Sequence, residues 1–178
     1  TQGVSSAASD VYKRQGAEFG EAKRWPSEHY AQVAEAKIRE GWQVWLFGSK
    51  NDHAVGEEIR GRLIPGLREE SSNLSGETSL AEAIDLLSCA DSVVSNDSGL
   101  MHVAAALNRP LVAVYGSTSP GFTPPLADRV EVVRLGIECS PCFDRTCRFG
   151  HYNCLRQLLP QPVNEALQRL QGTVVEVQ

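Results

Sequence analysis

One stretch of the sequence, from Ser92 to Leu107 (SVVSNDSGLMHVAAAL), combines a strand-like apolar run, a polar turn and a helix that is apolar on nearly all sides. Such a helix must be buried, with its first turn near the carboxyl end of a sheet, where open α/β sheets bind ligands. The backbone amides around Ser98, Gly99 and Leu100, together with the helix dipole, favour an anion such as a phosphate.

Two other polar residues of this stretch have roles of their own. Asp97 carries the wrong charge for an anion, so we expect it to cap the helix or to accept hydrogen bonds from sugar hydroxyls. His102 falls in the first helical turn and can donate to phosphate or sugar oxygens. Capping alone explains Asp97 and Ser98 equally well, and a single histidine is more often a packed or surface residue than a ligand contact.

Two further loops carry residues suited to the same anion. Gly16 to Pro26 (GAEFGEAKRWP) contains two glycines and the cations Lys23 and Arg24 just before a helix start, and Ser117 and Thr118 follow another apolar run. A Lys-Arg pair is usually solvated surface, but three polar loops after three strands predict one shared crevice. The sequence contains neither a G-x-G-x-x-G nor a Walker A pattern.

Four of the five cysteines, Cys139, Cys142, Cys147 and Cys154, fall close together, with His151 among them. The first pair has the spacing of metal ligands, and four thiolates can close a tetrahedral zinc site. Reduced structural thiols and disulfides are the alternatives. Five cysteines are too few for a disulfide-stapled secreted mini-protein, which favours a reducing compartment.

Composition limits the classes of function. The 178 residues are 42% hydrophobic and 22% charged, with a formal net charge of −5. These fractions are typical of a folded chain, and the length fits one domain. The acidic balance argues against a binder of nucleic acid or anionic membrane, because both need clustered Lys and Arg. No apolar run approaches the roughly 20 residues that span a bilayer, so we expect no transmembrane segment.

From Gly16 onward, β-type runs alternate with amphipathic helical runs, a pattern typical of an α/β fold with a mostly parallel sheet and flanking helices. Strands are expected at 43–47, 92–95, 111–115 and 130–135. Helices are expected at 27–40, 54–63, 99–107 and 162–170, and one more is expected to begin at residue 79. Ser27 and Thr78 are the expected caps of two of these helices. Cys89, on an apolar helix face, is expected in the core.

Several motifs, in the same order along the chain, resemble the heptosyltransferase family, which are bacterial inverting glycosyltransferases of the GT-B architecture. They are GAEFGEAKRWP, LFGSKNDH, SGETSLAEAIDLLSCADSVVSNDSGLMHVAAAL, VAVYGSTSPGFTPPL and CSPCFDRTCRFGHYNCL. The resemblance covers residues 16–178 and implies the C-terminal, Rossmann-like domain of such an enzyme, which holds the nucleotide-sugar donor. The acceptor half and the general base would lie elsewhere, leaving this fragment inactive alone.

The resemblance also implies the ligands and their contacts. The sugar donor would be ADP-heptose, and the acceptor the lipopolysaccharide inner core, reached through a missing N-terminal half. Lys23 would neutralise the donor diphosphate, with Arg24 a weaker candidate. The residues implied to contact the diphosphate and sugar are Asp97, Ser98, Gly99, Leu100 and His102. The implied enzyme is cytoplasmic, requires no cofactor, and associates at most peripherally with the inner membrane.

The chain departs from the family pattern in two places. An acidic residue in the loop after the second strand holds the adenosine in related enzymes, whereas here that loop reads GSKNDH and offers only Asp52. The family also has a strand before the GAEFG loop. Residues 1–15 (TQGVSSAASDVYKRQ) occupy its place, are rich in Ser, Ala and Gly, and show little periodicity. We interpret them as an artefactual or disordered leader and expect a frayed or missing edge of the sheet.

Two alternatives stay open. One is a non-enzymatic module, in which the cysteine cluster is a zinc knuckle that presents Arg145, Arg148 and Arg156 to a nucleic acid or a protein. The other is a different GT-B sugar-nucleotide enzyme. The net charge and the α/β pattern weigh against the knuckle. The NDSGLMH and CSPCF motifs weigh against the second alternative.

Overall fold

The computed structural model describes residues 9–13 and 20–172 of the chain. They form one six-stranded sheet in the order β3-β2-β1-β4-β5-β6, in which every neighbouring pair is parallel. The strands are β1 (Ser9–Lys13), β2 (Gln43–Phe47), β3 (Ser71–Asn73), β4 (Ser92–Asn96), β5 (Leu111–Val114) and β6 (Val130–Val133). This strand order is that of a Rossmann-like fold. The expected parallel α/β architecture is confirmed.

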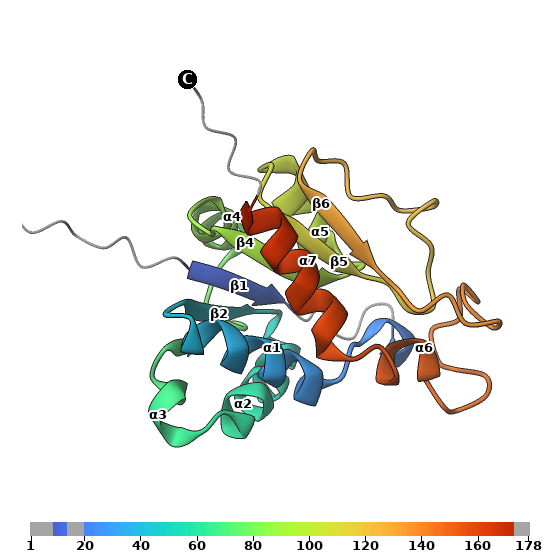
Figure 1. Cartoon of the computed structure of the whole chain (residues 1–178), viewed down its shortest axis with the longest axis horizontal. Coiled ribbons are helices and arrows are strands. Elements are labelled where there is room, and N and C mark those ends of the chain that lie inside the picture. Colours follow the sequence, from blue (N-terminus) through green and yellow to red (C-terminus); the bar gives the residue numbers. More distant parts are fainter. Residues whose placement is uncertain (1–8, 14–19, 173–178) are drawn as a thin grey trace, which may run out of the picture.

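Helices cover both faces of the sheet (Figure 1). On one face lie α1 (Ser27–Arg39), α2 (His53–Arg62) and α7 (Pro160–Gly172), and on the other α4 (Leu80–Ser88) and α5 (Gly99–Ala106). Shorter elements are the 3-10 turns η1 (Glu21–Lys23) and η2 (Lys50–Asp52) and the helices α3 (Pro65–Arg68) and α6 (Asn153–Arg156). The long helices lie where the periodicity placed them, within two residues at each end.

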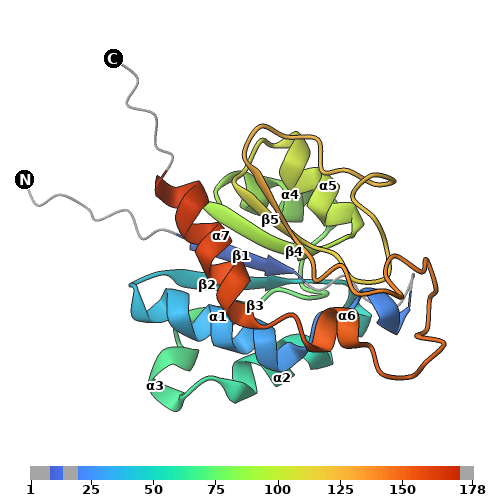
Figure 2. The ribbon, with the colours of Figure 1, turned by 45° about the vertical axis from the view of Figure 1, so that its right-hand side comes forward.

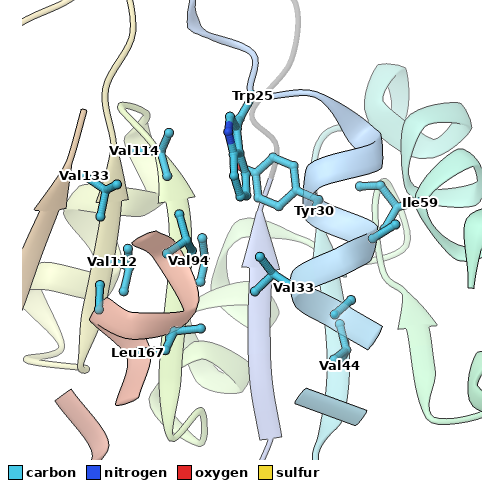
Figure 3. Packing of buried hydrophobic residues seen from close by; sticks show 14 of the residues in the cluster. Trp25, Tyr30, Val33, Val44, Ile59, Val94, Val112, Val114, Val133 and Leu167 are labelled. Carbon is cyan, nitrogen blue, oxygen red and sulfur yellow. The ribbon is translucent and has the colours of Figure 1, made fainter. Parts of the chain in front are cut away.

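Two hydrophobic cores lie on the two faces of the sheet. Alternate residues of β4 and β5 point to opposite faces, so Val94 and Val112 pack in one core and Val93 and Leu111 in the other. Figure 3 shows the first core, in which Trp25 and Tyr30 belong to the same cluster as residues of the strands, such as Val94. Strands buried on both faces explain why these segments read as continuous apolar runs.

The expectation of a frayed or missing sheet edge at residues 1–15 is wrong. Ser9–Lys13 forms β1, which pairs with β2 on one side and β4 on the other and so lies in the middle of the sheet. The ladder of a parallel strand is made by backbone groups, so a segment without apolar periodicity can supply it. Whether residues 1–8 are a leader lies outside the described residues.

Three local expectations are also corrected. The cap of α4 is Ser79 rather than Thr78, because Ser79 and Glu82 form a reciprocal capping box. Ser27 does not cap α1, since its hydroxyl donates to the Glu58 carboxylate instead. Cys89 is exposed at the end of α4, not in the core.

The buried ring of His29, near the start of α1, predicts a pH dependence of stability. Burial lowers its pKa, against the opposing charge of Glu28 and a backbone contact with Leu158. The unfolded chain, with an ordinary histidine pKa of about 6.5, therefore binds more protons in acid, so stability falls as the pH drops through that value. Urea unfolding at pH 7.5 and 5.5 should show a larger loss for the wild type than for His29→Gln. Equal losses would contradict the assignment.

Candidate functional site

The topology brings two loops to one point. The strand order reverses between β1 and β4, and a parallel sheet opens a crevice at the carboxyl ends of such a pair. The chain from β1 passes through residues 14–19, outside the described residues, to Gly20 and η1, which ends at Lys23. The chain from β4 leads directly to Asp97 and to α5.

Lys23 and Asp97 meet in this crevice as an ion pair. Lys23 Nζ lies 2.6 Å from Asp97 Oδ2, and the two side chains are only 16% and 4% exposed. The second oxygen, Asp97 Oδ1, accepts a hydrogen bond from Thr123 Oγ1 (3.2 Å). The expectation that Asp97 caps α5 is wrong, because Ser98 is the cap and its Oγ accepts from the Met101 amide (3.4 Å). The expected positive notch is therefore partly neutralised.

Asn96, the last residue of β4, fixes the chain just beyond Lys23. Its buried Oδ1 accepts hydrogen bonds from the Trp25 amide (3.3 Å) and from the Tyr30 hydroxyl (2.9 Å). The Trp25 indole in turn donates to the Leu158 carbonyl (2.7 Å). The segment that carries Lys23 is thus bound to β4 and to the chain before α7. The only sequence signal for Asn96 is its position next to Asp97.

Tyr115 fixes the third loop against the same carboxylate. Its hydroxyl donates to the Thr123 carbonyl (2.5 Å), so Thr123 is held where its own hydroxyl reaches Asp97. Burial raises the pKa of Tyr115 to about 12, and the charge of Asp97 adds to this effect. Tyr115 therefore remains a proton donor at physiological pH. Neither residue stood out in the sequence, because a tyrosine ending an apolar run reads as core.

The other expected anion-binding residues differ in burial and in their contacts. Gly99 and His102 are exposed in the first turn of α5, and Leu100 is partly exposed. The Ser117 amide donates to the Ala22 carbonyl (3.3 Å), which brings that loop to η1. The hydroxyls of Ser117 and Thr118 are buried and lack a hydrogen-bond partner among the described residues.

Two other expected contacts have local surroundings of their own. Arg24 lines a pocket of about 400 Å³, together with Arg62 and Arg156. Lys23 is not among the residues that line this pocket. Asp52, the weak candidate for adenosine, is used locally, because its Oδ2 accepts from the amide (2.9 Å) and hydroxyl (2.7 Å) of Ser49.

The four clustered cysteines line one small pocket of about 20 Å³, whose wall also includes His151 and Ser117. All four are free thiols. Hydrogen bonding with the neighbouring backbone, that of Tyr152 above all, lowers the pKa of the Cys147 thiol. Among the described residues no group of three or more His, Cys, Asp or Glu side chains is placed so that it could hold a metal ion as it stands.

The cysteine-bearing segment, residues 134–152, contacts both loops of the crevice. Figure 2 shows it and α6 beside η1. The Arg145 carbonyl accepts from the Ala22 amide (3.1 Å), and the Phe143 amide donates to the Ser117 carbonyl (2.7 Å). Ser140 Oγ donates to the Gly116 carbonyl (2.6 Å). The positions of Lys23 and Ser117 therefore depend on this segment.

A glycine at position 20 should be required for the close contact between the η1 loop and the Arg145 backbone. Its φ is +96°, and a Cβ there would come closer to the Arg145 carbonyl oxygen than any real contact allows. Gly41 is the matched control, since its φ is +92° but no atom lies within 4 Å of an added Cβ. Gly41→Ala should cost about 1–2 kcal/mol for the left-handed backbone alone, and Gly20→Ala about 3 kcal/mol, because overpacking adds to it. Denaturant unfolding measures both, and equal losses would contradict the close approach.

Comparison with known proteins agrees with this geometry. The model of "Glycosyltransferase family 9 (heptosyltransferase)" matches residues 11–153. Lipopolysaccharide heptosyltransferase 2 of Escherichia coli K12 is 49% identical over 155 residues, covering 87% of this chain and 44% of that protein. Lipooligosaccharide heptosyltransferase 2 of Haemophilus influenzae is 59% identical over 120 residues, covering 67% and 35%.

The solved structure of E. coli ADP-heptose lps heptosyltransferase II superposes with a TM-score of 0.81 at 46% identity, covering 94% of this chain and 47% of that one. The chain thus spans less than half the length of the relatives that it matches. The fold and the sequence of this chain therefore agree with those of these relatives. The chain belongs to glycosyltransferase family 9, the heptosyltransferases.

Proposed function

We propose that this chain is the donor-binding domain of a heptosyltransferase and that it binds ADP-heptose in the crevice between β1 and β4. The observation that carries the proposal is the 2.6 Å contact of Lys23 with Asp97 at the first turn of α5. It places a cation and a helix N-terminus on the same side of the sheet. The helix is only partly buried, with Met101, Ala104 and Ala105 in the core and Gly99 and His102 exposed. An ammonium group beside its first amides suits a diphosphate.

The ion pair suggests how the ligand is received. A diphosphate that enters the crevice competes with Asp97 for the Lys23 ammonium group. Once released, the Asp97 carboxylate can accept hydrogen bonds from sugar hydroxyls, while Thr123 keeps it in place. A single ion pair thereby prepares both a cation for the phosphates and an acceptor for the sugar.

The same groups can assist an inverting transfer. The acceptor hydroxyl attacks the anomeric carbon, and negative charge grows on the departing diphosphate. Fixed donors and cations at that oxygen stabilise the transition state. Lys23 and the first turn of α5 supply them without a metal cofactor. His102 and Gly99, exposed in that turn, are further contacts of the ligand.

The acceptor and the general base are inferred from the family to which the chain belongs. We propose an acceptor in the lipopolysaccharide inner core, with the general base and acceptor pocket in the part of the relatives that this chain does not match. We place the enzyme in the cytoplasm, associated at most peripherally with the membrane. In the described residues no helix has both the length and the apolar character needed to cross a bilayer. The family match disfavours a nucleic-acid-binding knuckle.

ADP titration of the purified chain tests the role of Lys23. Lys23→Ala should weaken ADP binding roughly 10- to 100-fold, because a hydrogen bond to a charged group contributes about 1.5–3 kcal/mol. Arg24→Ala is the matched control, since Arg24 lines the other pocket, and it should change the affinity less than about threefold. Calorimetry at fixed ionic strength measures both. Equal effects of the two substitutions would refute the assignment.

Asp97→Asn tests the competition for Lys23. Without the carboxylate charge, Asp97 no longer competes with the phosphates for the Lys23 ammonium group, so ADP should bind a few times more tightly than to the wild type. ADP-heptose should not share this gain, because its sugar loses an acceptor. Parallel titrations with the two ligands measure the difference. Weaker ADP binding to Asp97→Asn would contradict the exchange of partners.

A further inference from the structure

We propose that Cys139, Cys142, Cys147 and Cys154 bind one metal ion of the zinc or iron class as four thiolates, at a site separate from the sugar-donor crevice. Three of these cysteines lie in the segment 134–152, and the fourth lies in the first turn of α6. The proposal concerns a structural ion, and its test does not depend on the proposed function.

The first support is the pocket itself. The four thiols line a common space of about 20 Å³, enough for one small occupant. The Ser117 side chain, 1% exposed, lines the same pocket, and its hydroxyl has no hydrogen-bond partner among the described residues. Four thiols and one unpaired hydroxyl around an atom-sized space indicate a ligand site better than a hydrophobic core.

The second support is the backbone around Cys147. The Gly150 amide donates to the Cys147 carbonyl (2.9 Å), and the Cys147 sulfur lies 3.9 Å from His151 Nδ1, so the chain turns back on itself just after Cys147. Gly150, with φ +69°, allows this turn. The turn brings the chain from Cys147 back to the pocket that Cys154 also lines. Arg148 lines the same pocket and adds a positive charge beside the thiols.

The four thiols line one pocket but do not have the arrangement of metal ligands. Because no group of three described ligands has the geometry of a formed site, binding requires the sulfurs to move closer together. The segment 134–152 has no regular secondary structure, so small backbone shifts are open to it. Metal sites of this kind close as the ion binds. No disulfide joins any of the four.

The chemistry of the ligands selects the ion. Four thiolates in tetrahedral arrangement suit zinc or iron and exclude the oxygen-seeking magnesium and calcium. The His151 ring is an unsuitable fifth ligand, because its Nδ1 accepts from the Asn153 amide (3.0 Å). The segment that would be closed by the ion is the one that contacts Ala22 and Ser117. The ion would therefore stabilise the loops of the crevice without touching the sugar donor.

Elemental analysis of the full chain, purified under reducing conditions without chelator, is the test. We expect close to one zinc or iron per chain; a coloured protein identifies iron and a colourless one zinc. Cys142→Ser combined with Cys154→Ser should reduce the content to below about one tenth. Cys89→Ser, which changes the exposed cysteine outside the cluster, is the matched control and should leave it unchanged. Metal retained by the double variant would overturn the proposal.

A second measurement covers the case in which the double variant does not fold. The wild-type chain is stripped with a chelator and titrated with Co²⁺, whose thiolate complexes absorb in the near ultraviolet. Saturation at one Co²⁺ per chain, displaced by added Zn²⁺, supports the site. A wild-type protein that carries less than about one tenth of an ion and gives no Co²⁺ absorption would refute it.

Discussion

The ion pair between Lys23 and Asp97 is the contact on which the candidate site depends. Its two residues come from different loops, 74 positions apart in sequence, and meet because parallel order places β1 beside β4. Burying both charges is costly unless they remain paired. Each loop therefore constrains the other, and a ligand that separates the pair must replace both partners. A diphosphate-sugar offers anionic oxygens for the ammonium group and hydroxyl groups for the carboxylate.

Uncharged hydrogen-bonding groups hold the two loops that carry this ion pair. Asn96 holds the chain after Lys23, and Tyr115 holds Thr123 against Asp97. Each of these contacts ties a loop to the end of a buried strand, so the rigidity of the sheet is passed to the ion pair. Such preorganisation matters in transfer reactions, since groups already in place need not reorganise as charge develops.

Long periodic elements could be predicted from the sequence, and so could the meeting of the three loops, because both follow from rules of burial and parallel topology. The central position of β1 could not be predicted, because the hydrogen bonds that pair it with β2 and β4 use backbone atoms that any residue supplies. The sequence also could not show that Lys23 pairs with Asp97 while Arg24 lines another pocket, because the side chains of adjacent residues in a tight turn can have different surroundings. The use of Asp97 as an ion-pair partner rather than a cap depended on a neighbour distant in sequence.

The irregular cysteine-bearing segment helps to hold the loops of the candidate site. Residues 134–152 have no helix or strand to fix them, yet they supply the carbonyl and amide that hold Ala22 and Ser117. Fixing each residue of such a segment in one conformation costs conformational entropy. The ion that we propose would offset part of this cost by holding the four thiols together. The close approach of this segment to the η1 loop also explains Gly20, where an added Cβ would collide with the Arg145 backbone.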